Sequence, residues 1–269
     1  MKQLNGSELA AFIKERQARQ VRALLQASHV QPRLAIVKTS NDPVIATYVR
    51  LKKRYGEDIL VAVDVYEVPQ SEAAAKIEEL NADPTVHGII LQLPLADPSQ
   101  TEELVKLVAS HKDIDALGPD AAFDPATPMA INWLLAGYNV DLANKNIVMV
   151  GHGRLVGAPL TRMWRDSGLQ VTVVDRSTPD IAQVVQQADV VVTAVGVPGL
   201  IKSSMLRPDT VVVDAAVASE DGKLVGDLEP AIRERHDLTI TPEKGGVGPL
   251  TVSALFENVI RAARSTLAS

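Results

Sequence analysis

The sequence predicts an α/β protein with two domains around a cleft, each domain built on a parallel sheet. Short apolar runs alternate with helix-compatible segments along almost the whole chain, and strands separated by helices form parallel sheets with right-handed crossovers. One stretch, residues 111–128, is rich in Asp, Pro and Gly and has no clear period. We therefore expect a first domain over residues 1–120, a second over residues 121–248, and a last helix, 249–269, that packs back on the first domain.

The elements of the first domain follow from local signals. Ser7 suits the N-cap of an opening helix whose apolar face carries Leu9, Phe12, Ile13 and Leu24. A second helix ends in three consecutive basic residues, and Ser71 suits the cap of a third. In chain order we expect helices at 7–26, 43–55, 71–80 and 101–110, and strands at 34–39, 60–68 and 88–95.

The second domain continues the alternation. Its strands are short apolar runs of the kind that are buried on both faces of a parallel sheet. We expect these strands at 147–150, 170–174, 190–194 and 210–215, and helices at 129–136, 158–166, 180–187, 202–206 and 249–267.

The composition excludes several classes of function. The net charge of −6 argues against a general affinity for nucleic acid or anionic membranes. The chain has no cysteine, which excludes disulfides, thiolate nucleophiles and cysteine-ligated metals and fits a reducing cytoplasm. Its beginning has no signal-peptide core, and no uncharged apolar run approaches the ~18 residues that span a membrane. We therefore expect a cytoplasmic protein.

The most informative segment is NIVMVGHGRLVGAP, residues 146–159. Gly151, Gly153 and Gly157 lie between a predicted strand and a predicted helix, where glycines let the backbone approach a pyrophosphate at a helix N-terminus. The next strand ends at Asp175, 22 positions after Gly153, near where an acidic residue reaches a cofactor ribose. This context predicts a Rossmann-like NAD(P)-binding domain. The alternative is a tight turn that binds no ligand.

The first domain carries polar residues in positions that suit a site. Tyr48 and Lys52 share one helix face, and Gln92 lies in an apolar strand, where a buried amide needs hydrogen-bond partners. Asp113 and Asp115 follow a helix, in the kind of loop that often carries ligand contacts. Each also has an ordinary explanation: lysines are usually solvated, and a strand glutamine can cap a backbone group.

Together these segments resemble the bifunctional methylenetetrahydrofolate dehydrogenase/methenyltetrahydrofolate cyclohydrolase enzymes, over nearly the full length. The resemblance rests on YVRLK at 48–52, QLPL at 92–95, KDID at 112–115, TP at 127–128, the glycine segment at 151–159 and GGVGPLT at 245–251. It implies oxidation of methylenetetrahydrofolate with NAD(P)+ and hydrolysis of methenyltetrahydrofolate to 10-formyltetrahydrofolate. It also implies a small folate substrate, no metal, and a homodimer through the cofactor domain.

The resemblance implies a role for each matched residue. Lys52 would handle the proton transfers of hydrolysis with Gln92 hydrogen-bonded to it, Tyr48 would pack on the folate, and Asp115 would accept hydrogen bonds from the pterin. Gly245 and Gly246 would approach folate and nicotinamide, and Pro249 would start the last helix. The positions that match the family's cofactor site are Gly151, His152, Gly153, Gly157 and Val217.

Some positions depart from the family pattern. These are Ile45, Ala116–Gly118, Ala130, 215–218 and Glu243–Lys244, and they put substrate affinity and the balance of the two activities in question. The cofactor also stays open between NAD and NADP. Asp175 favours NAD, because it can accept hydrogen bonds from the ribose. The resemblance favours NADP, which bacterial members of the family usually use, and Arg176 could pair with its 2′-phosphate. We lean to NAD. Alternative functions are a shikimate-dehydrogenase-like oxidoreductase and a non-catalytic dinucleotide-binding paralogue.

Overall fold

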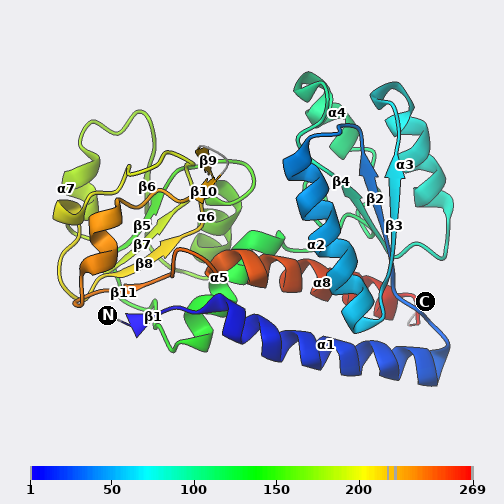
Figure 1. Ribbon diagram of the computed structural model, residues 1–269, viewed down its shortest axis with the longest axis horizontal. Helices are drawn as coiled ribbons and strands as arrows, with labels where there is room; N and C mark the ends of the chain where they lie inside the picture. Colours follow the sequence, from blue (N-terminus) through cyan, green and yellow to red (C-terminus); the bar gives the residue numbers. More distant parts are fainter. Residues whose placement is uncertain (1, 217, 221–222, 268–269) are drawn as a thin grey trace. The chain divides into compact units, whose positions relative to one another are not determined.

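The computed structural model describes residues 2–216, 218–220 and 223–267 (Figure 1). Contacts between Cα atoms divide the chain into two compact units. Unit 1 comprises residues 2–10 and 127–251, and unit 2 comprises residues 11–126 and 252–267. Residues 2–10, which the sequence analysis assigned to the first domain, thus belong to unit 1.

Unit 1 is built on a six-stranded parallel sheet with the order β1-β11-β8-β7-β5-β6. Its central strands are Val-rich and almost wholly buried, as expected for parallel strands covered on both faces. From β5 the chain passes to β6 on one side and then to β7 on the other, so the order in which strands are added to the sheet reverses at β5. Such a reversal is where α/β sheets bind ligands. The strands are β1 (Lys2–Gln3), β5 (Ile147–Val150), β6 (Val171–Val174), β7 (Val190–Thr193), β8 (Val211–Asp214) and β11 (Thr239–Ile240).

The remaining elements of this part of the chain are short. The helices are α5 (Ala126–Gly137), α6 (Gly157–Asp166) and α7 (Ile181–Val185), and β9 (Ala218–Glu220) pairs antiparallel with β10 (Lys223–Val225). The helix expected at 202–206 is a single 3₁₀ turn, η3 (Ser203–Met205), and a second such turn is η4 (Pro230–Glu234). The helix expected at 180–187 is shorter than predicted.

Unit 2 holds a three-stranded parallel sheet with the order β3-β2-β4, against which α2 and α3 pack (Figure 1). Asp113 extends it through an isolated parallel bridge to Ile89. The strands are β2 (Arg33–Lys38), β3 (Ala62–Glu67) and β4 (Gly88–Leu91). The helices are α1 (Gly6–Ser28), α2 (Pro43–Ile59), α3 (Ala73–Ala82), α4 (Thr101–Val105) and α8 (Val247–Ser265), with 3₁₀ turns η1 (Gln70–Glu72) and η2 (Pro98–Gln100). The first residues of α1 and of α8 belong to unit 1.

The sequence dictates both ends of α2, the helix that carries Lys52. Asp42 caps its start by accepting the Val44 N–H at 2.6 Å, and Pro43 occupies the first turn, where its missing N–H costs nothing. The helix ends where Leu60 adopts a left-handed conformation with φ 66°. Tyr48 and Lys52 are four positions apart on this helix, so both lie on one face.

Two elements of unit 2 are shorter than the sequence predicted. The strand expected at 88–95 ends at Leu91, and a cis Leu93–Pro94 bond follows. The helix expected at 101–110 ends at Val105. Beyond it, the Asn81 amide donates to the Leu107 carbonyl at 2.7 Å and accepts the Ala109 N–H at 3.0 Å. These backbone groups are therefore paired with a side chain instead of continuing the helix.

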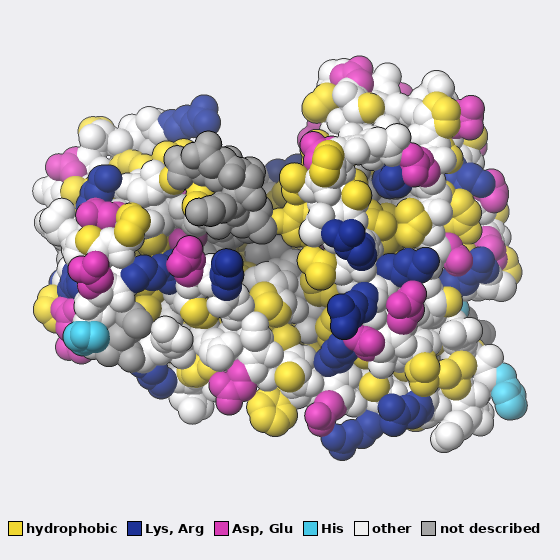
Figure 2. Space-filling view, in the orientation of Figure 1, with side chains coloured by type: hydrophobic (Ala, Val, Ile, Leu, Met, Phe, Trp, Pro, Cys, Tyr) yellow, Lys and Arg dark blue, Asp and Glu magenta, His cyan; other side chains and the backbone are white. Residues whose placement is uncertain are grey.

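Two kinds of structure are absent from the described part of the chain. None of its helices combines the length and the apolar character needed to cross a bilayer. Within the same residues, His, Asp and Glu side chains do not gather in groups of three or more that could hold a metal ion. On the face shown in Figure 2, Lys and Arg side chains are interspersed with Asp and Glu.

Candidate functional site

A lysine–glutamine pair lies at the carboxyl edge of the sheet in unit 2. The Lys52 Nζ donates to Gln92 Oε1 at 2.7 Å. Gln92 directly follows β4; its backbone N–H donates to the Val37 carbonyl at 2.8 Å and its Nε2 to the Leu93 carbonyl at 2.9 Å. The backbone N–H and Nε2 of Gln92 thus donate to backbone carbonyls, while its side-chain oxygen accepts from the amine. The hydrogen bond that the resemblance implies is therefore present in the structure.

Burial tunes the amine and a nearby carboxyl group. Burial lowers the pKa of Lys52, because removal from water disfavours the ammonium form, and the charge of Asp115 opposes this shift. Burial raises the pKa of Asp115, and the charge of Lys52 opposes that shift in turn. The structure thus brings together Lys52, Gln92 and Asp115, three of the polar residues that the sequence singled out in this domain. They form an amine, an amide and a carboxyl group with reduced access to water.

A tight loop fixes Asp115. The buried Asp113 carboxylate accepts the N–H of Gly118 at 2.7 Å and of Leu117 at 3.4 Å, and Ala116 adopts a left-handed φ of 54°. A side chain at position 118 would meet Asp113, since an added Cβ would lie 3.0 Å from Oδ2. Asp113 is therefore a structural residue that closes the loop around Asp115. The departure from the family pattern at Gly118 belongs to this turn.

Asn258 is a supporting residue that the sequence analysis missed. Its Nδ2 donates to the carbonyls of Ile114 and Asp124, both at 2.9 Å, from a fully buried position on α8. It thereby holds the backbone next to Asp115. In the sequence, the one signal for Asn258 is its place on an apolar helix face. That signal predicts that the side chain is hydrogen-bonded, but it does not say to which partner.

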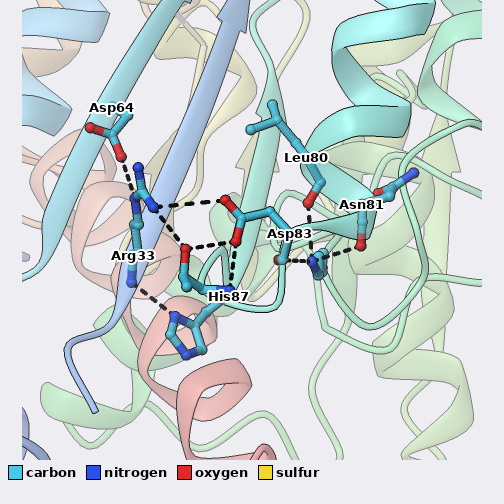
Figure 3. A network of polar contacts seen from close by, with 8 residues as sticks. Arg33, Asp64, Leu80, Asn81, Asp83 and His87 are labelled. Atoms are coloured by element: carbon cyan, nitrogen blue, oxygen red, sulfur yellow. Dashed lines mark hydrogen bonds and ion pairs between the residues drawn. The ribbon is translucent and has the colours of Figure 1, made fainter. Parts of the chain in front are cut away.

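The opposite, amino edge of the same sheet holds a polar network (Figure 3). Lys112 donates to the carbonyls of Leu80, Asn81 and Asp83 at 2.7–3.0 Å, where α3 ends, and a cation there complements the helix dipole. Arg33 donates to Asp64 at 2.6 Å, and its backbone N–H donates to Nδ1 of His87 at 3.2 Å. The lysine of the KDID segment thus anchors a helix end.

The glycine segment in unit 1 makes a turn that side chains would block. Gly151 follows β5 directly with φ +95°, and a Cβ there would lie 2.8 Å from Val195 Cγ2 and 3.0 Å from the Ala194 oxygen. A Cβ on Gly157, the first residue of α6, would lie 2.0 Å from the Gly151 oxygen. Around Gly153 an added Cβ meets nothing within 4 Å. Two of the three glycines are therefore required by packing, and the third faces open space.

Asp175 is the first residue after β6, as the sequence predicts. Its Oδ1 accepts the Ser177 hydroxyl at 2.6 Å and the Ser177 N–H at 2.8 Å. These hydrogen bonds, and then the charge of His152, lower the pKa of Asp175. The carboxylate is therefore ionised near neutral pH, close to the glycine turn. Arg176, next to it, is exposed, and Val217 lies outside the described residues.

The second glycine loop, at 245–246, packs on the start of α1 within unit 1. The Ser7 N–H donates to the Gly245 carbonyl at 2.9 Å, Gly245 has φ +81°, and a Cβ on Gly6 would lie 1.8 Å from the Gly246 oxygen. Pro249 does not start the last helix, so that expectation is wrong: α8 begins at Val247. Pro249 still falls in the first turn, where backbone N–H groups have no intrahelical partner.

Both halves of the chain match models of one family. The catalytic-domain model of tetrahydrofolate dehydrogenase/cyclohydrolase matches residues 4–115, and its NAD(P)-binding-domain model matches residues 125–267. A relative named bifunctional protein FolD, from Exiguobacterium sibiricum, is 35% identical over 97% of this chain and 99% of its own length.

Solved structures agree in fold over the full length. The bifunctional FolD methylenetetrahydrofolate dehydrogenase/cyclohydrolase of Campylobacter jejuni is 32% identical, with a TM-score of 0.93 and 99% coverage of both chains. The methylenetetrahydrofolate dehydrogenase-cyclohydrolase of Trypanosoma brucei, solved with NADP and an inhibitor, is 28% identical, with a TM-score of 0.92 and 98% coverage of both chains.

Proposed function

Because the chain belongs to the tetrahydrofolate dehydrogenase/cyclohydrolase family, we propose that it oxidises methylenetetrahydrofolate with NAD(P)+ and hydrolyses the methenyltetrahydrofolate product to 10-formyltetrahydrofolate. The observation that carries the proposal is the 2.7 Å hydrogen bond between the Lys52 amine and Gln92, beside the half-buried carboxyl group of Asp115. The match to both domain models sets aside the shikimate-dehydrogenase-like alternative.

The oxidation requires positioning more than acid–base chemistry. Adjacent nitrogen lone pairs stabilise the cation that remains when hydride leaves the methylene carbon, so no proton departs with it. NAD(P)+ supplies the hydride acceptor when bound. The residues that would hold it are Gly151, His152, Gly153 and Gly157, with Asp175 and Arg176 at the end of β6. The fit rests on the absence of side chains at 151 and 157, which leaves the turn tight enough for backbone groups to reach a pyrophosphate.

The hydrolysis requires proton transfer, which we assign to Lys52. A water molecule that adds to the methenyl carbon must lose a proton, and a neutral amine can accept it. The bond from that carbon to N5 then breaks, and the departing N5 takes up a proton, which the ammonium form of the amine can return. Burial lowers the pKa of Lys52 in the required direction, and the cationic substrate would lower it further. Gln92 orients the amine. Asp115 accepts hydrogen bonds from the pterin, and Tyr48 packs on the folate ring.

The first experiment is a spectrophotometric assay of the purified protein with methylenetetrahydrofolate and either NAD+ or NADP+. The proposal predicts formation of reduced cofactor, followed by 10-formyltetrahydrofolate. A protein that binds a dinucleotide but oxidises no methylenetetrahydrofolate with either cofactor would instead be the non-catalytic paralogue.

We further propose that NAD is the preferred cofactor. The Asp175 carboxylate is ionised at the end of β6, where it accepts hydrogen bonds from ribose hydroxyls and repels the 2′-phosphate of NADP. The expected result is that Asp175→Ser shifts kcat/KM toward NADP. A wild type that prefers NADP by about tenfold or more, ~1.4 kcal/mol, together with loss of that preference in Arg176→Ala, would assign the phosphate to Arg176 instead.

We also propose a cytoplasmic homodimer formed through unit 1. The family resemblance supports the dimer, and the cysteine-free sequence suits a reducing compartment. Light scattering on the purified protein should give twice the chain mass of 28.8 kDa. A mass equal to one chain at micromolar concentration would contradict the dimer.

A further inference from the structure

A fully buried carboxylate, Asp227, accepts hydrogen bonds from a single loop of unit 1. This loop, residues 194–197, directly follows β7. Asp227 Oδ1 accepts the N–H groups of Gly196 and Val197, and Oδ2 accepts the N–H of Val195, all at 2.8 Å. Oδ2 also accepts the Thr193 hydroxyl at the end of β7. Three successive backbone donors and one hydroxyl thus converge on one charge.

The backbone of Asp227 is itself anchored. Its N–H donates to Asp214 Oδ1 at 3.2 Å, and the N–H of Leu228 donates to Asp214 Oδ2 at 3.3 Å. A Cβ on the preceding Gly226 would lie 2.0 Å from Asp214 Oδ2. Asp227 therefore presents its carboxylate to the loop from a fixed position.

The loop that Asp227 holds adjoins the glycine turn. A Cβ on Gly151 would collide with Val195 and Ala194, so the loops after β5 and β7 are fitted against each other. They meet where the strand order of the sheet reverses. The loop leaves two apolar side chains accessible, Val195 at 36% and Val197 at 46%. An apolar surface next to a phosphate turn suits the planar rings or ribose carbons of a dinucleotide.

We infer that Asp227 is a positioning residue for dinucleotide binding: it holds loop 194–197 as an apolar wall of the cofactor site. The inference rests on the proposed function. Charge-assisted hydrogen bonds to backbone N–H groups are short and directional, so the shape of the wall depends on an acceptor with two oxygens. An asparagine keeps the size of the side chain but offers one oxygen, and its NH₂ group would face two donors.

The experiment compares Asp227→Asn with a matched control. Asp189 lies at the other end of β7, where it accepts the Asn146 N–H at 2.8 Å and binds Arg207, so Asp189→Asn makes the same chemical change away from the loop. Calorimetric titration with NAD+ and NADP+ should show at least about a tenfold weaker Kd for Asp227→Asn and little change for Asp189→Asn. Cyclohydrolase kcat with methenyltetrahydrofolate, a reaction that uses no dinucleotide, should stay within about twofold of the wild type for both.

Two results would overturn the inference. One is an Asp227→Asn protein with wild-type dinucleotide affinity. The other is an equal loss of cyclohydrolase and dinucleotide binding in a folded protein, which would make Asp227 a general stabiliser. If Asp227→Asn does not fold, Val197→Ser changes the exposed wall alone, and an unchanged Kd there would equally contradict the inference. Failure of the proposed function is distinct, because the wild type itself would then oxidise no methylenetetrahydrofolate, whatever its affinity for the dinucleotide.

Discussion

Two groups of opposite charge are withdrawn from water at the carboxyl edge of unit 2. Burial favours the neutral amine of Lys52 and the neutral carboxyl of Asp115, and each charge partly restores the charged form of the other. The amine therefore has a pKa set by two opposing effects, of which burial is the larger. A change in Asp115 should be transmitted to Lys52 through the electrostatic interaction between them.

The sign of that effect gives a prediction for the pH dependence of hydrolysis. Because the Asp115 carboxylate raises the pKa of Lys52, Asp115→Asn removes this support and should lower it further. If the neutral amine accepts the proton, kcat for methenyltetrahydrofolate hydrolysis rises as Lys52 deprotonates. The rising limb of the kcat–pH profile should thus move to lower pH in Asp115→Asn and stay in place in Asp120→Asn, a change at an exposed carboxylate. A limb that moves to higher pH would contradict the assignment.

Asp115 has a second proposed role, in holding the pterin. A substitution that removes the whole polar group tests this role. Loss of a charge-assisted hydrogen bond to a buried partner costs roughly 1.5–3 kcal/mol. Asp115→Ala should therefore raise the folate KM in both reactions by about tenfold or more, because both reactions use one folate pose. Initial rates at varied folate concentration measure this. Unchanged kinetics in both assays would remove Asp115 from the site.

Sequence patterns identified some of these residues and not others, for physical reasons. Lys52 and Gln92 were recognisable because they lie in two segments, YVRLK and QLPL, that resemble a known family, although each residue alone has an ordinary explanation. Asp227 was not, because its partners on loop 194–197 are backbone N–H groups, which every non-proline residue has. Asp113 and Asp115 are both loop carboxylates in the sequence. The family resemblance gave a site role to Asp115 alone, and the turn at Gly118 shows the structural role of Asp113, which the sequence did not predict.

At the scale of elements, the β5–α6 turn depends on backbone contact. Gly157 lies so close to the Gly151 carbonyl that no side chain fits, whereas Gly153 has open space. The three glycines, which look equivalent in the sequence, therefore differ in how much each position tolerates.

This difference predicts the outcome of paired substitutions. Gly157→Ala forces a Cβ toward the Gly151 oxygen, and relief of such overlap by backbone shifts costs typically about 1–3 kcal/mol. We expect a lower Tm and at least about tenfold weaker dinucleotide binding for Gly157→Ala, with both values near wild type for Gly153→Ala. Thermal unfolding and calorimetric titration measure the two effects. Loss of binding in Gly153→Ala with none in Gly157→Ala would show that packing of the turn is not what matters.

The predictability of elements follows their length and context. The longer helices α1, α2 and α8 and the buried Val-rich strands were predicted, because their periodicity extends over many residues. The two-residue strands β1 and β11 and the β9–β10 pair were missed, because segments of two or three residues are too short to show a hydrophobic period. The early end of α4 was missed because it depends on Asn81, a partner distant in sequence.

At the scale of the whole molecule, each unit has a parallel sheet whose strand order reverses about an interior strand, β5 in unit 1 and β2 in unit 2. In unit 1 the glycine turn, Asp175 and the loop held by Asp227 lie at the carboxyl edge. In unit 2 the same edge carries Lys52, Gln92 and Asp115. We therefore propose a division of the chemistry between the units: unit 1 binds the hydride acceptor, and unit 2 carries the proton transfer of hydrolysis.

The division is tested most directly by the products that Lys52→Met forms from methylenetetrahydrofolate and NAD(P)+. Only hydrolysis needs the amine, and removal of a positioned proton-transfer group costs about 10²- to 10⁴-fold. Lys52→Met should keep much of the dehydrogenase and accumulate methenyltetrahydrofolate, whereas wild type and Lys53→Met, a change at the exposed neighbouring lysine, should proceed to 10-formyltetrahydrofolate. Formation of 10-formyltetrahydrofolate by Lys52→Met at the wild-type catalysed rate would contradict the account.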